Sequence, residues 1–248
     1  MNIIVNGCFG KLGSAVRRVI ADDAGSVLVA GVDLVDAPAD FPVYNAISGV
    51  REKADAVIDC SGAPALTAVL EYAVKTNTPA VLCATGYSDA QQKQIDEAAR
   101  RVQIVCSSNM SVGINLLCEL AKTCARVLGG SFDVEIVEAH HNQKLDAPSG
   151  TAVMLADAVK EGLDYEAELV YDRHSRREKR GEHEIGMSSI RGGTIVGEHE
   201  IIFAGRDEVV KLSHSAFSKE VFAAGALNAA KFAVSVKPGR YTMKDVIG

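Results

Sequence analysis

Three glycines close to the N-terminus constrain the fold more than any other feature of the sequence. Residues 2–6 have the apolar pattern of a short strand, and residues 14–21 have the pattern of a helix. Gly7, Gly10 and Gly13 lie between the two, with the spacing GxxGxxG instead of GxGxxG. In a strand–turn–helix unit the first glycine permits a tight turn, the second lets the backbone approach a pyrophosphate, and the third lets the helix pack against the strand. The segment predicts a dinucleotide-binding unit, and the alternative is a glycine-rich turn without a ligand.

An acidic residue ends the next apolar segment. Residues 27–32 are strand-like, and Asp33 follows Gly13 at the separation, about 20 residues, at which an acid binds the ribose hydroxyls of adenosine. A 2′-phosphate there would meet a like charge. The two residues after Asp33 are apolar, Asp36 is a second acid, and Lys11 in the glycine turn is the one nearby cation that the sequence indicates. We therefore expect NADH to be preferred over NADPH, with NADPH still usable.

Strand-like and helical segments alternate through the rest of the N-terminal part. They cover residues 56–59, 65–76, 79–83, 88–101 and 102–106. Such alternation predicts an α/β fold, a Rossmann-like doubly wound parallel sheet with helices on both faces. Ligands of this fold bind beyond the carboxyl ends of the strands. These ends are marked by Gly7, Asp33, Cys60, Thr85 and Ser107.

The pattern changes after an apolar helix at residues 114–128. Longer strand-like segments now follow one another, at residues 132–137, 184–191, 194–204 and 208–215. Gly192-Gly193 and Gly205 separate the last three segments and are hairpin signals. We expect a second, α+β domain built on a mostly antiparallel sheet. An alanine-rich helix at residues 219–234 and a short tail at residues 238–247 complete the chain.

Composition narrows the class of protein. With 248 residues, 48% of them hydrophobic and 23% charged, the chain has the composition of a soluble globular protein with one large or two ordinary domains. It has no apolar run as long as a membrane span. The net charge of −6 argues against a general nucleic-acid binder, and the basic run at residues 173–180 is typical of a solvated loop. Six cysteines without a CxxC pair indicate reduced thiols and a cytoplasmic location.

A second cluster of chemically active residues follows the strand-like residues 132–137. His140, His141 and Lys144 come just past it, and Ser149 is a plausible N-cap of a helix at residues 151–160. A helix start offers free N–H groups and a positive dipole end to a carboxylate or phosphate. Histidine and lysine are the usual proton-transfer side chains, although solvated surface residues are the alternative. No metal site is expected, because adjacent histidines lack chelating spacing and no cysteine lies nearby.

These segments together resemble a known family. Residues 138–152, with the sequence E-A-H-H-N-Q-K-L-D-A-P-S-G-T-A, are similar to the signature E-x-H-H-x-x-K-x-D-x-P-S-G-T-A of the 4-hydroxy-tetrahydrodipicolinate reductases, also called dihydrodipicolinate reductases. This family acts in the diaminopimelate route to lysine. Residues 109–115, 191–199 and 238–246 carry further similarity, so the resemblance runs nearly from end to end.

The resemblance implies roles for individual parts of the chain. Residues 1–111 plus 220–248 would form the dinucleotide-binding domain, and residues 112–219 the domain for substrate binding and assembly into a homotetramer. His140 and Lys144 would be catalytic, with Lys144 as the proton donor. His141, Gly150 and Thr151 would bind a small dicarboxylate substrate. The cofactor would be lined by Gly7, Cys8, Phe9, Gly10, Lys11, Leu12, Asp33, Cys83, Ala84, Thr85, Ser107, Ser108, Asn109 and Met110.

The sequence departs from the family pattern at two strand ends that would face the cofactor. Cys83-Ala84 stands where the family often has Gly-Thr, and Cys60-Ser61 stands where it often has Phe-Thr. Many members also carry an arginine directly after the acid that corresponds to Asp33, where this chain has Leu34. Two other functions remain open. The chain could be a different Rossmann amino-acid dehydrogenase, or a nucleotide sensor that binds NAD(H) without turnover.

Overall fold

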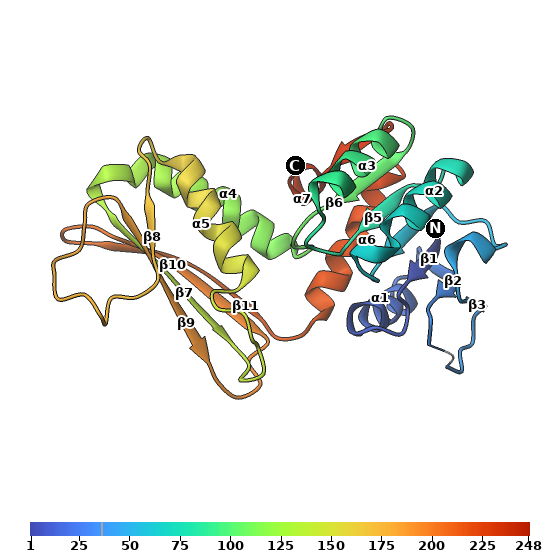
Figure 1. Ribbon diagram of the computed structural model, residues 1–248, viewed down its shortest axis with the longest axis horizontal. Coiled ribbons are helices and arrows are strands. Elements are labelled where there is room, and N and C mark those ends of the chain that lie inside the picture. Colours follow the sequence, from blue (N-terminus) through green and yellow to red (C-terminus); the bar gives the residue numbers. More distant parts are fainter. Residues whose placement is uncertain (36) are drawn as a thin grey trace. The chain divides into compact units, whose positions relative to one another are not determined.

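The structure, a computed structural model, describes residues 1–35 and 37–248, so Asp36 lies outside the described residues. The chain forms two compact units. The first consists of Met1–Val112 and Lys219–Gly248, and the second of Gly113–Ser218 (Figure 1). The sequence-based division placed the boundaries after residues 111 and 219. The roles that it gave to the two parts stay predictions at this point.

The first unit is built on a parallel sheet of seven strands in the order β12-β6-β5-β4-β1-β2-β3. The strands are β1 (Asn2–Asn6), β2 (Val27–Val32), β3 (Val43–Tyr44), β4 (Ala56–Asp59), β5 (Ala80–Leu82), β6 (Gln103–Cys106) and β12 (Gly239–Tyr241). The chain runs outward from β1 to β3, returns, and then runs outward again from β4. This reversal beside β1 places the switch point of the sheet at the glycine turn.

Helices cover both faces of this sheet, because successive side chains of a strand point to opposite faces. Ile3 and Val5 pack with α1 and α6, whereas Ile4 packs with α2 and α3. The helices are α1 (Lys11–Asp22), α2 (Leu66–Thr76), α3 (Asp89–Ala99), α6 (Glu220–Ala233) and α7 (Met243–Ile247). Ser88 caps α3 through a capping box with Gln91. The fold class expected from alternating segments is confirmed for this unit.

The second unit contains a five-stranded sheet in the order β11-β10-β7-β9-β8. Its strands are β7 (Asp133–His140), β8 (Glu168–Val170), β9 (Glu184–Arg191), β10 (Gly197–Ala204) and β11 (Val209–Ala216). Helices α4 (Val112–Leu128) and α5 (Gly150–Gly162) share one apolar core with one face of the sheet (Figure 1). Strand β7 is central and pairs antiparallel with β10 but parallel with β9.

The sheet of the second unit is therefore mixed, and one hairpin prediction was wrong. Strands β9 and β10, on either side of Gly192-Gly193, do not pair with each other, because β7 lies between them and pairs with both. Turn glycines indicate that the chain reverses direction. They do not indicate whether another strand lies between the two strands that they connect. The hairpin at Gly205 is confirmed by the β10–β11 pairing. The short strand β12, which pairs with β6, was missed because Gly239–Tyr241 carries no alternating pattern.

Candidate functional site

The glycine turn after β1 has the close approaches that its sequence predicts. Gly7 has a φ of +74°, and a Cβ there would lie 2.8 Å from the backbone N of Ser61. A Cβ on Gly13 would lie 2.0 Å from the carbonyl oxygen of Gly7. A side chain on Gly7 would thus push the turn away from the residues after β4. A side chain on Gly13 would push α1 away from the turn. The backbone at the start of α1 stays accessible as a result, which is what a pyrophosphate requires.

Asp33, directly after β2, is held against this turn. Its Oδ2 accepts a hydrogen bond from Phe9 N at 2.8 Å, and its Oδ1 accepts one from Val35 N at 3.1 Å. Each carboxylate oxygen keeps a further lone pair, so the acid is oriented by the protein and still able to accept from hydroxyl groups.

A cavity of about 640 Å³ opens beside Asp33 at the carboxyl ends of β1, β2 and β4. This volume suits a small-molecule ligand or a large part of a dinucleotide. The lining includes the predicted residues Gly7, Phe9, Gly10 and Asp33, together with Cys60. Among the remaining lining residues are Val32, Leu34, Val35, Ile47, Ala65, Ala68 and Val69. Apolar side chains on both sides of the acid provide a surface on which an adenine ring could pack.

The other residues predicted to line the cofactor occupy different environments. Cys8 and Met110 are buried in the core shared with α1 and α6, so only their backbone is near the turn or the end of β6. Lys11 is exposed at the start of α1. The remaining predicted residues are Leu12, which packs against the same core, and Cys83, Ala84, Thr85, Ser107, Ser108 and Asn109, which follow β5 and β6.

A buried carboxyl group that sequence reasoning missed connects β1 with β4. Asp59 Oδ1 accepts hydrogen bonds from Asn6 Nδ2 at 2.8 Å, Ser61 Oγ at 2.5 Å and Ser61 N at 3.1 Å. Burial raises the pKa of Asp59 in spite of these bonds. The group fixes the turn after β4 where it faces Gly7. The available signal was an aspartate at the end of a fully buried strand.

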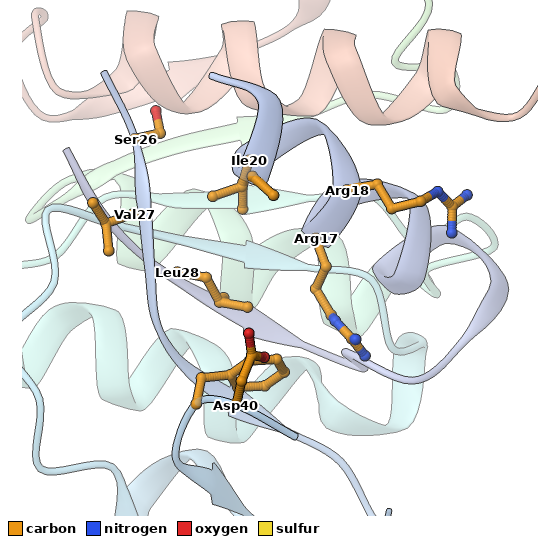
Figure 2. A pocket seen from close by; sticks show the side chains of 9 residues that line it. Arg17, Arg18, Ile20, Ser26, Val27, Leu28 and Asp40 are labelled. Atoms are coloured by element: carbon orange, nitrogen blue, oxygen red, sulfur yellow. The ribbon is translucent and has the colours of Figure 1, made fainter. Parts of the chain in front are cut away.

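A cation was also missed beside the glycine turn. The Arg17 guanidinium carbon lies 5.2 Å from the centre of the Phe9 ring and 5.0 Å from that of Phe41. Figure 2 shows the Arg17 side chain extending from α1 toward Asp40, within a second cavity of about 390 Å³. Among the described residues Arg17 forms no ion pair, whereas its neighbour Arg18 pairs with Glu220 at 2.9 Å. Arg17 Nη1 also donates to the carbonyl oxygen of Cys8 at 3.4 Å, so Arg17 is a second cation beside the glycine turn, in addition to Lys11.

In the second unit His140 lies at one end of the sheet face that α4 and α5 cover. Residues 134, 136, 138 and 140 of β7 point to this face because they alternate with the others. Val134 and Ile136 belong to the apolar core. The next row across the sheet is polar: Glu138 lies beside Ser189 on β9 and His199 on β10, and His199 lies beside His214 on β11. His140 lies one row further on, beside Arg191.

Glu138 is the centre of this polar group and is only 1% exposed. It accepts hydrogen bonds from Arg191 Nη1 at 2.9 Å and Nη2 at 2.7 Å, from His140 Nδ1 at 2.5 Å, and from Ser149 N at 3.2 Å. Burial by itself raises the pKa of Glu138, but the bonds from Arg191, Ser189 and His140 outweigh it and lower the pKa to about 2. Glu138 is therefore ionised at neutral pH.

His199 joins the polar row to the start of α5. Its Nε2 lies 3.1 Å from Ser149 Oγ, and its ring meets that of His140 edge-on with 5.2 Å between centroids. Burial, together with the nearby His140, lowers the pKa of His199 to about 4, so its ring is neutral at pH 7. Ser149 is the N-cap that the sequence predicted, with its Oγ accepting from Ala152 N at 3.2 Å.

The structure brings His140 and the start of α5 together but gives Lys144 a separate partner. Lys144 Nζ lies 2.8 Å from Asp146 Oδ2, in the loop between β7 and α5. Arg191 Nη2 donates to the carbonyl oxygen of Asp146 at 2.7 Å, which ties the same loop to β9. Strand β7 ends at His140, three residues later than the sequence indicated, and His141 follows it. Gly150 and Thr151 are the first residues of α5.

Across residues 1–35 and 37–248, no group of three or more His, Cys, Asp or Glu side chains has an arrangement that could hold a metal ion. In the same part of the chain, no helix combines the length and the apolar character needed to cross a membrane.

A doubly wound sheet with a glycine turn and an oriented acid, in one chain with a buried glutamate–histidine pair beside a helix start, is typical of a nucleotide-dependent oxidoreductase. Residues 1–110 match the family described as dihydrodipicolinate reductase, N-terminus, and residues 113–247 match dihydrodipicolinate reductase, C-terminus. The chain belongs to the dihydrodipicolinate reductase family, so the resemblance seen in the sequence is confirmed.

Individual relatives agree with this family. The chain is 49% identical to the 4-hydroxy-tetrahydrodipicolinate reductase of Caldanaerobacter subterraneus subsp. tengcongensis over 247 residues, covering 100% of this chain and 98% of the relative. It is 44% identical to the enzyme of the same name from Clostridium botulinum over 249 residues, covering 100% and 98%. The fold is similar to that of a dipicolinate-bound dihydrodipicolinate reductase from Paenisporosarcina sp. TG-14, with a TM-score of 0.83, 23% identity, and coverage of 99% and 98%.

Proposed function

We propose that this chain catalyses the NAD(P)H-dependent reduction of 4-hydroxy-tetrahydrodipicolinate to tetrahydrodipicolinate, a step of the diaminopimelate route to lysine. The observation that carries the proposal is the contact of His140 with the buried Glu138, which also binds the start of α5, in a chain of the dihydrodipicolinate reductase family. Replacing the 4-hydroxy group by hydrogen consumes one hydride and one proton and releases one water molecule.

The first unit is proposed to bind the cofactor, a pyridine nucleotide. The cavity of about 640 Å³, the close backbone approach at Gly7 and the oriented Asp33 fit such a group. When bound, the nicotinamide supplies the hydride. Backbone N–H groups from Gly7 to Leu12 would contact the pyrophosphate, and Asp33 the adenosine ribose. Residues 83–85 and 107–110 would complete the contacts. NADH is proposed to be preferred, with NADPH also accepted.

The second unit is proposed to bind and protonate the substrate, which carries two carboxylates. The N–H groups at the start of α5 are suited to one carboxylate, with Gly150, Thr151 and His141 as its ligands. Loss of water from the 4-hydroxy compound gives a conjugated cyclic imine. Hydride addition at C4 of this imine leaves an electron-rich enamine that must take one proton. Lys144 is the proposed donor and His140 its catalytic companion. The salt bridge with Asp146 is consistent with a charged lysine before the reaction.

Assembly and location complete the proposal. The second unit is proposed to mediate a homotetramer, because one face of its sheet carries no helix of that unit. The protein would act in the cytoplasm, where its six cysteines would stay reduced.

A coupled assay tests the function. Pyruvate, aspartate semialdehyde and the upstream synthase generate the labile substrate, and the oxidation of NADH or NADPH is followed by absorbance. We expect turnover that requires all of these components. Turnover only with an amino acid and an oxidised nucleotide would favour an amino-acid dehydrogenase. Nucleotide binding without turnover on any of these substrates would favour a sensor.

A further inference from the structure

We infer that Glu138 is a positioning residue, which fixes His140 as the tautomer with its proton on Nδ1 and thereby presents Nε2 as the reactive nitrogen. The inference deepens the proposed function, since it rests on His140 acting in the reaction. Sequence reasoning assigned no role to Glu138, although glutamate and histidine two residues apart on a strand share one face.

The hydrogen bonds of Glu138 leave one arrangement for the imidazole. An ionised carboxylate only accepts, so the 2.5 Å contact with His140 Nδ1 requires the proton to be on that nitrogen. Two donors of Arg191, at 2.9 and 2.7 Å, and Ser149 N, at 3.2 Å, hold the same carboxylate from β9 and from the turn before α5. Glu138 cannot turn toward another partner without leaving a buried charge unpaired, which is costly.

The surroundings of His140 Nε2 support the same tautomer. Continuing the register of β7 and β10 beyond Ala139 and Glu198 places Gly197 opposite His140. A Cβ on Gly197 would lie 3.1 Å from His140 Nε2, so the absence of a side chain keeps this nitrogen uncovered. The His140 side chain is 11% exposed, and the edge-on contact with His199 limits its rotation. A buried ring with Nδ1 bound and Nε2 uncovered is suited to exchange a proton through Nε2.

Charged or titratable groups lie around this pair on the neighbouring strands and the loop. They are Arg191 on β9, His199 on β10, His214 on β11, and Lys144 with Asp146 in the loop before α5. His199 and His214 are both shifted by burial toward their neutral forms. Arg191 is therefore the principal permanent positive charge next to Glu138. The Glu138 carboxylate is in turn the principal negative charge next to His140.

The test combines nitrogen NMR with kinetics. In the unmodified protein without substrate, ¹⁵N shifts of the His140 ring at pH 8 should show a protonated Nδ1 and an unprotonated Nε2. Glu138→Gln should give a mixture of tautomers and lower kcat roughly 10- to 100-fold, with KM changed less than about threefold.

Glu161→Gln is the matched control, because Glu161 of the same unit pairs with Lys122 at the surface, at 2.9 Å. It should leave the tautomer and kcat as in the unmodified protein. A predominant Nε2–H tautomer in the unmodified protein would overturn the inference, and this measurement needs no variant to fold. Unchanged kcat and an unchanged His140 tautomer in a folded Glu138→Gln protein would also overturn it. If the coupled assay shows no reductase activity, the proposed function fails, while the tautomer is still decided by NMR.

Discussion

At the residue scale, Lys144 is positioned by charge. Its ammonium group pairs with Asp146 at 2.8 Å, and 21% of its side chain is exposed, so it can move toward a dianionic substrate that competes for the pair. Lys144→Ala should lower kcat by about 10²–10⁴-fold, the usual contribution of a general acid. Binding of NADH, measured by fluorescence titration, should be nearly unchanged. Lys160→Ala, in the last turn of α5, is the control. Near-normal kcat in Lys144→Ala would rule out its role as donor.

We also expect single residues to decide the choice of cofactor. The fixed carboxylate of Asp33 should favour the two ribose hydroxyls of NADH over a 2′-phosphate. We expect kcat/KM to be roughly 10- to 100-fold higher with NADH. Leu34 is 91% exposed beside Asp33, so Leu34→Arg has room to hold a phosphate and should shift the preference toward NADPH. A clear NADPH preference in the unmodified protein would contradict this assignment of Asp33.

The same measurement separates the two cations near the turn. Lys11→Ala and Arg17→Ala should each reduce kcat/KM for NADPH more than for NADH, because only NADPH carries the additional phosphate charge. Arg17 is held between Phe9 and Phe41, whereas its neighbour Arg18 is paired with Glu220. Arg18→Ala is therefore the matched control for Arg17→Ala. Equal losses with both cofactors would assign Arg17 to packing instead of phosphate recognition.

At the scale of elements, the start of α5 brings backbone N–H groups and Thr151 to one place. The cap at Ser149 and its bond to Glu138 fix where this helix begins. Thr151→Val should raise KM for the dicarboxylate while kcat changes little, because a contact to a carboxylate is made equally in the ground state and the transition state. Thr123→Val, an exposed position of α4, is the control. A fall in kcat alone would exclude Thr151 as a carboxylate ligand.

The polar row across β9, β7, β10 and β11 should make stability depend on pH. His199 has its pKa lowered to about 4 by burial, whereas an unfolded histidine titrates near 6.5. Between these values the unfolded state binds more protons, so the free energy of unfolding should fall as pH decreases from about 6.5 to 4, by on the order of 2–3 kcal/mol. Urea unfolding at a series of pH values measures this. His199→Gln should flatten the dependence, unlike His174→Gln at an exposed loop position. Equal slopes in all three proteins would refute the assignment.

At the scale of the whole molecule, the second unit leaves one sheet face without helices of its own. Ile190 on β9 is 52% exposed and Val209 on β11 is 55% exposed, although both are large and apolar. Edge strands and apolar faces of this kind are usually covered by a partner. We expect light scattering at assay concentrations to give the mass of a homotetramer. Val209→Lys should lower that mass, and Val127→Lys on α4 should not. A stable, active monomer would contradict the proposed assembly.

The sequence by itself determined the local parts of this protein. The strand, glycine turn and helix at residues 2–22, the caps at Ser88 and Ser149, and the β10–β11 hairpin agree with the structure. Each depends on side chains within a few residues of one another, or on an alternation that a strand imposes on its own segment. The cluster from His140 to Thr151 could also be located in the sequence, because its members lie on one strand end and the helix that follows.

Only the tertiary structure decided the partners of that cluster. Arg191 lies 53 residues from Glu138 in sequence, and His199 lies 50 residues from Ser149, yet both reach the same buried group. Their positions depend on β7 lying between β9 and β10, which the turn glycines did not reveal. The pairing of β12 with β6 and the contact of Arg17 with Phe41 likewise join residues that lie apart in the sequence. Strands distant in sequence pair in the register that buries their whole apolar faces together, and no local pattern specifies that choice.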